Sequence, residues 1–151
     1  MNKKDTVVFD LDGTLLDTLE DLKNSVNYAM TQCGYPEHTL DEVRRYVGNG
    51  ILLLMQRAIP GGKDDPNFDK AFTLFKEHYG KHCNDTTKPY AGIMELLRTL
   101  KENNIKIAIV SNKADFAVKE LNAIYFKDLI PVAIGEKESE GIRKKPAPDT
   151  V

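Results

Sequence analysis

Hydrophobic positions along the chain follow two different periods, and the change between them predicts two kinds of structure. Thr6–Phe9 is a short and almost unbroken apolar run, which is typical of a strand buried on both faces of a parallel sheet. From about residue 18, apolar residues recur every three or four positions and predict an amphipathic helix. These residues are Leu19, Leu22, Val26, Met30 and Cys33. Asp17, with Glu20 three positions later, predicts a capping box where that helix begins.

Helical periodicity continues well beyond this first helix. Further helices are expected over about residues 40–47, 51–58 and from residue 68 onward. Gly48-Asn49-Gly50 separates the first two of these, and its residues tolerate a positive φ. Residues 16–83 are therefore expected to form an entirely helical domain.

A different alternation follows. The pattern predicts a helix over about residues 93–100, a strand over 105–110, a helix over 114–123 and a weaker strand over 130–134. Such alternation implies parallel βαβ units with right-handed crossovers. The fold class is therefore α/β: a Rossmann-like parallel sheet core from residues 1–15 and 84–151, interrupted by the helical insertion. Ligands bind at the carboxyl ends of such strands, so the insertion is expected to act as a lid over the site.

Composition and charge narrow the function classes. The 151 residues carry 21 basic and 23 acidic side chains, a net charge of −2, which gives no basic excess for nucleic acid. The apolar runs are too short for a membrane span or a signal peptide, so a cytoplasmic location is the default expectation. The two cysteines make no disulfide framework. His78, His82 and Cys83 could share a helix face as metal ligands, but no second ligand pair with zinc spacing exists, so an ordinary helix is favoured.

Two carboxylates follow the first strand in the run Asp10-Leu11-Asp12-Gly13-Thr14-Leu15. Residues spaced i, i+2 at a strand end point to the same side, and Gly13 lets the backbone turn away. Like charges this close repel each other, and Mg²⁺ would relieve the repulsion. We interpret Asp10 as a nucleophile and Asp12 as a general acid and base. The alternative is a plain polar turn, in which Asp and Gly are common.

Two later clusters follow the other predicted strands. Ser111-Asn112-Lys113 ends the strand over 105–110, where a hydroxyl can hold a phosphate oxygen. Ser and Asn also favour helix N-caps, and for Ser111 taken alone that interpretation is preferred, although the two roles are compatible. Lys145 precedes Pro146, which restricts its backbone and helps to fix its ammonium. For Arg143 and Lys144 we favour a solvated basic run that offsets the nearby glutamates.

This order of clusters resembles the haloacid dehalogenase (HAD) superfamily, and within it the phosphoglycolate phosphatase-like branch, whose helical cap is inserted after the first motif. The resemblance covers essentially the whole chain. It implies an Mg²⁺-dependent phosphatase that hydrolyses a small phosphate monoester through an aspartyl-phosphate on Asp10, with Asp12 as acid and base. Metal ligands would come from Asp10 and the carbonyl of Asp12. The residues implied to bind phosphate are Gly13, Thr14, Ser111, Asn112 and Lys145. Dehalogenases of the superfamily lack an acid at the Asp12 position, which favours phosphate chemistry.

The resemblance also suggests a substrate loop in the cap. Gly48-Asn49-Gly50 is similar to the loop that reaches over the substrate in this branch, and Arg44 and Arg45 precede it. A turn flanked by surface arginines is an equally good interpretation.

The chain departs from the family pattern at its end. The superfamily carries a fourth, acidic motif after a further strand, whereas only six residues follow Lys145. We therefore expect a truncated core that lacks its C-terminal strands, an apolar first strand with an open edge, and weak or absent turnover.

Other functions remain open. A phosphomutase of the same superfamily would return the phosphoryl group to a sugar. A receiver-like signalling module uses similar residues but has no helical insertion after its first strand. A non-enzymatic or catalytically impaired fragment is the third alternative. The expected partner is a small phosphorylated metabolite, and neither its identity nor the oligomeric state can be derived from the sequence.

Overall fold

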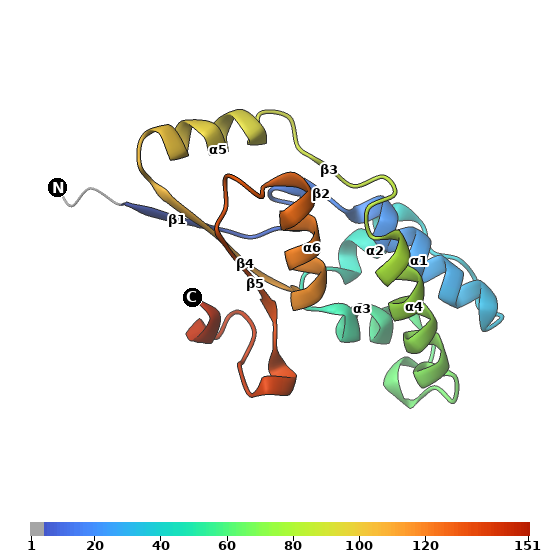
Figure 1. The fold of residues 1–151 in the computed structure, drawn as a ribbon. Coiled ribbons are helices and arrows are strands. Elements are labelled where there is room, and N and C mark those ends of the chain that lie inside the picture. The colour runs from blue at the N-terminus through green and yellow to red at the C-terminus, as the bar shows by residue number, and fades with distance from the viewer. Residues whose placement is uncertain (1–4) are drawn as a thin grey trace. The chain divides into compact units, whose positions relative to one another are not determined.

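The computed structural model describes residues 5–151, which form two compact units (Figure 1). The core unit comprises the described residues up to Asp17 together with Pro89–Val151, and the helical unit comprises Thr18–Lys88. The elements are β1 (Thr6–Phe9), β2 (Leu16–Asp17), α1 (Leu19–Gln32), α2 (Leu40–Tyr46), α3 (Ile51–Ala58), α4 (Phe68–His82), β3 (Lys88–Pro89), α5 (Ile93–Glu102), β4 (Lys106–Ala114), α6 (Asp115–Tyr125) and β5 (Val132–Glu136), with short 3-10 turns at Gly62–Asp64, Glu138–Glu140 and Pro148–Thr150.

A three-stranded parallel sheet organises the core unit, in the order β1-β4-β5. Val8 pairs with Ala108 across the first ladder, and Ile109 pairs with Ala133 across the second. Helix α6 connects the two later strands, so this part is a parallel βαβ unit. The predicted α/β class, a parallel sheet with an inserted helical unit, is confirmed.

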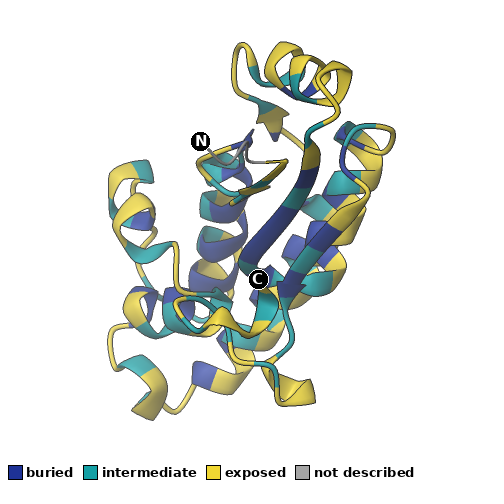
Figure 2. Cartoon of the chain, turned by 90° about the vertical axis from the view of Figure 1, so that its left-hand side faces the viewer, coloured by how far each residue is buried: buried dark blue, intermediate teal, exposed yellow. Residues whose placement is uncertain are grey.

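The central strand β4 carries most of the buried sheet surface, as Figure 2 shows by colour. Ile107 and Ile109 pack into an apolar cluster with Leu97 of α5 and with Val118 and Leu121 of α6. Side chains that alternate along a strand reach both faces of the sheet, so helices on either side can cover them. This cluster holds the carboxyl ends of the strands in place.

The first strand is less buried than its apolar sequence predicts. The residues of β1 alternate between exposed and intermediate positions, and Val8 is 44% exposed. Within residues 5–151, β1 pairs with β4 alone, so it is an edge strand. The prediction of a strand buried on both faces was wrong, whereas the expected open edge of this strand is confirmed for the described residues.

The β4–β5 ladder contains an irregularity near its carboxyl end. Val110 pairs with Ile134 but Ala114 pairs with Glu136, so β4 holds two more residues than its partner there. Gly135 lies opposite this bulge, and a Cβ at that position would lie 2.4 Å from Asp115 Cα and 2.5 Å from the Lys113 carbonyl oxygen. Only glycine permits such a close approach of two backbones.

The helical unit has its own apolar core. Buried residues of α1, α3 and α4 form it, among them Val26, Met30, Leu54, Met55 and Phe75. Amphipathic helices bury one stripe each, so three or four of them can enclose a small core without a sheet. No helix within residues 5–151 has both the length and the apolar character that a membrane span requires.

Helix caps in this unit differ from the sequence prediction. Helix α1 begins after Thr18, and no side chain caps it, whereas Asp17 belongs to β2. The predicted Asp17 capping box was therefore wrong, since strand pairing already places that residue. A capping box does occur at α2, where Thr39 and Glu42 bond reciprocally.

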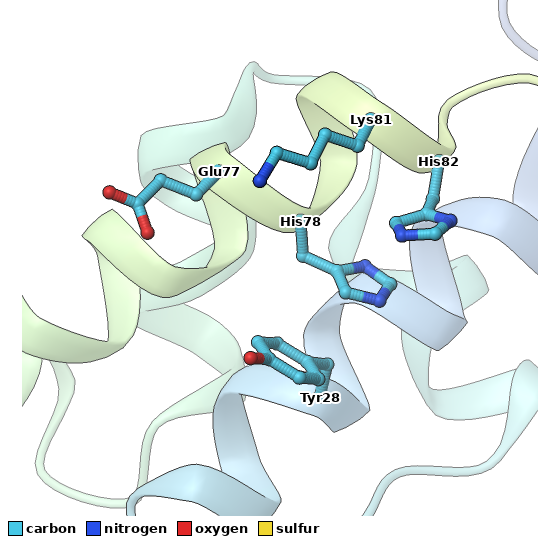
Figure 3. A pocket seen from close by; sticks show the side chains of 5 residues that line it. All are labelled: Tyr28, Glu77, His78, Lys81 and His82. Atoms are coloured by element: carbon cyan, nitrogen blue, oxygen red, sulfur yellow. The ribbon is translucent and has the colours of Figure 1, made fainter.

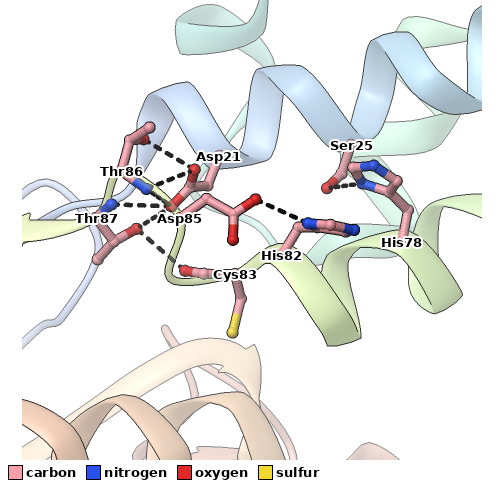
Figure 4. A network of polar contacts seen from close by, with 8 residues as sticks. All are labelled: Asp21, Ser25, His78, His82, Cys83, Asp85, Thr86 and Thr87. Atoms are coloured by element: carbon pink, nitrogen blue, oxygen red, sulfur yellow. Dashed lines mark hydrogen bonds and ion pairs between the residues drawn. The ribbon is translucent and has the colours of Figure 1, made fainter.

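The carboxylate of Asp21 ties α1 to the segment that follows α4 (Figure 4). It is 1% exposed and accepts hydrogen bonds from the amides and hydroxyls of Thr86 and Thr87, at 2.8 to 3.0 Å. Burial alone would raise the pKa of Asp21, but these hydrogen bonds outweigh it and hold the pKa below its ordinary value. Backbone amides and hydroxyls thereby stabilise this buried anion.

Replacing Asp21 by Asn should destabilise the helical unit by about 2 to 4 kcal/mol, because an amide nitrogen would face hydrogen-bond donors. The lowered pKa means that the carboxylate stabilises the fold above the unfolded-state pKa near 4 and loses this effect as the pH falls below it. The free energy of unfolding, measured with urea between about pH 7 and pH 3, should therefore fall more steeply with decreasing pH for the unaltered chain than for Asp21→Asn. Asp69 is exposed, so Asp69→Asn is the control. An equal loss of stability in both variants would contradict the stabilising role of the Asp21 hydrogen bonds.

Candidate active site

Buried leucines shape the turn that carries the two N-terminal aspartates. Leu11, Leu15 and Leu16 are fully buried, and the Leu11 carbonyl oxygen accepts the amides of residues 14, 15 and 16. Gly13 has a φ of 75°, which lets the chain reverse directly after Asp12. Because Leu11 points into the core, its neighbours Asp10 and Asp12 are left at the surface of the unit, 44% and 26% exposed.

The structure brings Lys145 to Asp10. The Lys145 Nζ lies 3.0 Å from Asp10 Oδ1 and donates a second hydrogen bond to the Val110 carbonyl oxygen at 2.8 Å. These residues are 135 positions apart in the chain. Asp10 follows Phe9, the last residue of β1, and Val110 follows Ile109, the residue of β4 that pairs with Phe9. Both therefore lie where the β1–β4 ladder ends. The Val110 contact fixes the ammonium beside the carboxylate.

Asn112 anchors the main chain of Lys145. Its Oδ1 accepts the Lys145 amide at 2.9 Å, and its Nδ2 donates to the Lys145 carbonyl oxygen at 3.2 Å. A side-chain amide that bonds both backbone groups of one residue restrains that residue as a strand neighbour would. The phosphate-binding role expected for Asn112 stays a prediction, and the structure gives its side chain a positioning contact.

A second lysine meets the second aspartate. Lys113 Nζ lies 3.0 Å from Oδ1 and 3.3 Å from Oδ2 of Asp12, and the Lys113 side chain is 2% exposed. Each of the two carboxylates therefore has an ammonium contact, which lowers their mutual repulsion. The Mg²⁺ expected at this pair stays a prediction.

Ser111 is buried at 4% exposure, and its Oγ accepts the Lys113 amide at 3.1 Å. It lies within β4, which runs through Ala114, and α6 begins only at Asp115 with Ala114 as its N-cap residue. The interpretation of Ser111 as the N-cap of that helix was therefore wrong, because the strand continues through the bulge. Thr14 is exposed in the turn after Gly13.

The loop that carries Lys145 is closed by an ion pair. Arg143 donates from Nε and Nη2 to the Asp149 carboxylate at 2.9 and 2.7 Å, and its amide donates to the same group. This hydrogen bonding from Arg143 lowers the pKa of Asp149 to about 2. Lys144 pairs with Glu138 at 3.3 Å, as expected for a basic run that offsets glutamates. Arg143 instead pairs with an aspartate beyond Lys145, so it shapes the loop.

The expected substrate loop lies in the helical unit. Asn49 Oδ1 accepts a hydrogen bond from Arg57 Nη2 at 3.1 Å, and the same guanidinium donates to the Tyr46 carbonyl oxygen. Gly48 and Gly50 have φ angles of 113° and 88°, and Gly50 is the N-cap residue of α3. Arg45 is exposed in the last turn of α2. Any contact of this loop with a substrate stays a prediction.

The histidines of α4 line a pocket of the helical unit (Figure 3). The His78 ring lies between Tyr28 and His82, with ring centroids 4.4 and 4.3 Å away, and Glu77 and Lys81 complete the lining. Burial, and the charge of His82 next, lower the pKa of His78. His78 bonds Ser25, His82 bonds Asp85, and Cys83 is buried and forms no disulfide.

The model of the haloacid dehalogenase-like hydrolase family matches residues 7–151, nearly the whole chain. The chain belongs to this family.

Relatives of this HAD-family chain include phosphoglycolate phosphatases. The enzyme of Thiobacillus denitrificans is 36% identical over 113 residues, which are 72% of this chain and 50% of that protein. The enzyme of Nitrosospira multiformis is 33% identical over 147 residues, 94% of this chain and 64% of that protein. The chain thus spans between half and two thirds of these two relatives. A crystal structure from Lactobacillus delbrueckii subsp. bulgaricus, provisionally assigned as a phosphoglycolate phosphatase, aligns over 98% of this chain and 70% of that one, with a TM-score of 0.86 and 32% identity.

The oxygen atoms of this HAD-family site are of the type that binds hard cations such as Mg²⁺. Asp10 offers partly exposed carboxylate oxygens, and Mg²⁺ is commonly held by one or two carboxylates with water and substrate oxygens. Within residues 5–151 there is no group of three or more His, Cys, Asp or Glu that could hold a metal.

Sequence reasoning missed Lys113 as a member of this site. It was noted only as the neighbour of Ser111 and Asn112, because strand alternation alone does not place three consecutive residues around one site. The signal that could have found it is the run of polar residues in an otherwise apolar strand, followed by a glycine in the partner strand, which together indicate a bulge.

Proposed function

We propose that the protein is a phosphoric monoester hydrolase that acts on a small phosphate monoester, phosphoglycolate or a close analogue, through an aspartyl-phosphate on Asp10. The carrying observation is the Lys145 ammonium, 3.0 Å from Asp10 Oδ1 and anchored on the Val110 carbonyl oxygen. A fixed ammonium beside a carboxylate nucleophile is suited to receive a phosphoryl group, because charge on the transferring oxygens is neutralised as it develops. The names and family of the relatives support the same chemistry.

In the proposed reaction, an Asp10 oxygen attacks phosphorus and the bond to the leaving oxygen breaks. Asp12 gives that oxygen a proton, and in the second step takes a proton from the water that displaces Asp10. Lys145 and Ser111 hold transferring oxygens, and Asn112 keeps Lys145 in place through its main chain. The Asp10 carboxylate and the Asp12 carbonyl would hold Mg²⁺. When bound, Mg²⁺ would offset negative charge on the phosphoryl group.

The helical unit has a proposed part in this reaction as the cap. The loop Gly48-Asn49-Gly50 with Arg45 would contact the non-reacting end of the substrate, where a guanidinium suits an anionic group. Excluding water during phosphoryl transfer is the physical benefit of such a cap.

Phosphate release from 2-phosphoglycolate with Mg²⁺ tests the proposal. The 151-residue chain should release phosphate at least about 100-fold faster than Asp10→Asn, and EDTA should abolish the difference. Release slower than about 1 s⁻¹ would agree with the weak turnover expected from the sequence. Faster release would contradict that expectation but would leave the proposed function intact. Release equal to that of Asp10→Asn contradicts the proposed function. Conversion of a hexose phosphate to its isomer without free phosphate would instead indicate a mutase.

A further inference from the structure

Lys113 is a buried charge to which the proposed function gives no role. Its side chain is 2% exposed, and its ammonium contacts both oxygens of Asp12. Removing an ammonium from water costs free energy that only a well-placed partner offsets. An apolar side chain at this strand position would avoid the desolvation cost of a buried ammonium. Stability alone therefore does not explain the lysine.

The backbone around Lys113 is built to aim this side chain. The bulge between Val110 and Ala114 inserts two extra residues into β4, and a bulge changes the direction in which a strand side chain points. Gly135 lets β5 approach the Lys113 carbonyl oxygen, and its amide donates to Asp115 Oδ1 at 2.9 Å. Hydrogen bonds from Lys119 and Gly135 outweigh the effect of burial and lower the pKa of Asp115, so this anchor stays ionised.

The contact with both Asp12 oxygens restricts rotation of that carboxylate. Asp12 is 26% exposed and directly follows a buried residue in a tight turn, so its side-chain torsion is the main freedom that it keeps. A buried ammonium 3.0 and 3.3 Å from the two oxygens removes this freedom. Proton transfer depends strongly on such alignment.

We propose that Lys113 is a positioning residue that holds the Asp12 carboxyl group in line with the leaving oxygen of the substrate. The inference rests on the proposed function, and it assigns Lys113 an effect exerted through Asp12 and not on the phosphoryl group. Before the first step, Asp12 takes up a proton from solvent on one oxygen while Lys113 keeps its bond to the other. In that step the phosphorus–oxygen bond to the leaving group breaks, the new bond to Asp10 forms, and the Asp12 proton moves to the leaving oxygen. An alkoxide needs that proton, whereas 4-nitrophenolate leaves without it.

Single-turnover assays with enzyme in excess separate these cases. The leaving group released in the first step is measured with 4-nitrophenyl phosphate and with an alkyl phosphate, the faster of 2-phosphoglycolate and a hexose 6-phosphate. In Lys113→Met the alkyl reaction should slow by about 30-fold or more, and the aryl reaction by less than about 3-fold. Lys101→Met is the matched control, because its ammonium bonds the Asp128 carbonyl oxygen outside the site. If Lys113→Met lacks the thermal transition of the unaltered chain, Lys113→Gln takes its place.

A double-mutant comparison separates positioning from general damage. Adding Lys113→Met to Asp12→Asn should slow the alkyl reaction by less than a further 3-fold or so, because the group through which Lys113 acts is already gone. The inference would be overturned if Lys113→Met slowed both substrates equally or slowed neither. It would also be overturned if the losses in the double mutant were additive, or if the unaltered chain accepted the aryl phosphate alone. An unaltered chain no faster than Asp10→Asn would overturn the proposed function and the inference with it.

Discussion

Replacing Lys145 by Met should reduce kcat/KM for phosphate release by about 10²- to 10³-fold, because one preorganised positive donor is lost beside the nucleophile. The Lys145 Nζ bonds both Asp10 Oδ1 and the Val110 carbonyl oxygen, so methionine removes this ammonium from the carboxylate. The side chain is 31% exposed, and Asn112 bonds only the main chain of this residue. The loop should therefore keep its backbone conformation. The substitution should lower kcat strongly and change the free energy of unfolding little.

Lys144→Met is the matched control for this experiment. Lys144 is the preceding lysine on the same loop, but its ammonium pairs with Glu138 at 3.3 Å. An exposed pair of this kind contributes little, so the control should stay within about twofold of the unaltered chain. Similar losses in both variants, or a loss in Lys145→Met that follows its thermal unfolding curve, would show that the site has been misassigned.

Replacing Gly135 by Ala should destabilise the core unit by about 3 kcal/mol or more. The added Cβ would lie 2.4 and 2.6 Å from Asp115 Cα and N, and 2.5 Å from the Lys113 carbonyl oxygen. All three are backbone atoms, so no side-chain rotation relieves the overlap and β5 has to move away from the bulge. The movement should also separate Lys113 from Asp12. The amides of β4 should then exchange hydrogen faster than in the unaltered chain, and urea unfolding should occur at lower concentration.

Gly80→Ala provides the control for the glycine substitution. Gly80 lies inside α4, and a Cβ there meets nothing within 4 Å. Alanine should keep or raise stability, by up to about 1 kcal/mol, because glycine is unfavourable in a helix interior. A Gly135→Ala chain as stable as Gly80→Ala would contradict the close approach of β5 to the bulge.

Local patterns predicted most elements of the fold. Helix α3 runs from Ile51 to Ala58 and strand β1 from Thr6 to Phe9, as their periodicity predicts. The strand-end rule also placed Asp10 and Lys145 at one sheet edge, although 135 positions separate them. The elements were predictable because apolar periodicity reports which side of an element is buried. The shared edge was predictable because the carboxyl ends of parallel strands meet there.

Features that depend on a second element were not predictable in this way. The cap of α1, for example, depends on the pairing of Asp17 in β2. The Lys113–Asp12 pair spans 101 positions and depends on a bulge opposite Gly135. Single-residue propensities carry no information on such long-range registers.

Identification of the phosphorylated residue tests the central claim most directly. The Asp12→Asn variant should accumulate phosphorylated chain with 4-nitrophenyl phosphate and Mg²⁺, because the group that activates water is missing. Borohydride reduction of an aspartyl-phosphate marks the modified residue, which peptide mass spectrometry can then locate. The proposed function predicts one reduced residue, at position 10. Reduction at another acidic position, or no phosphorylated chain at any time, would contradict it.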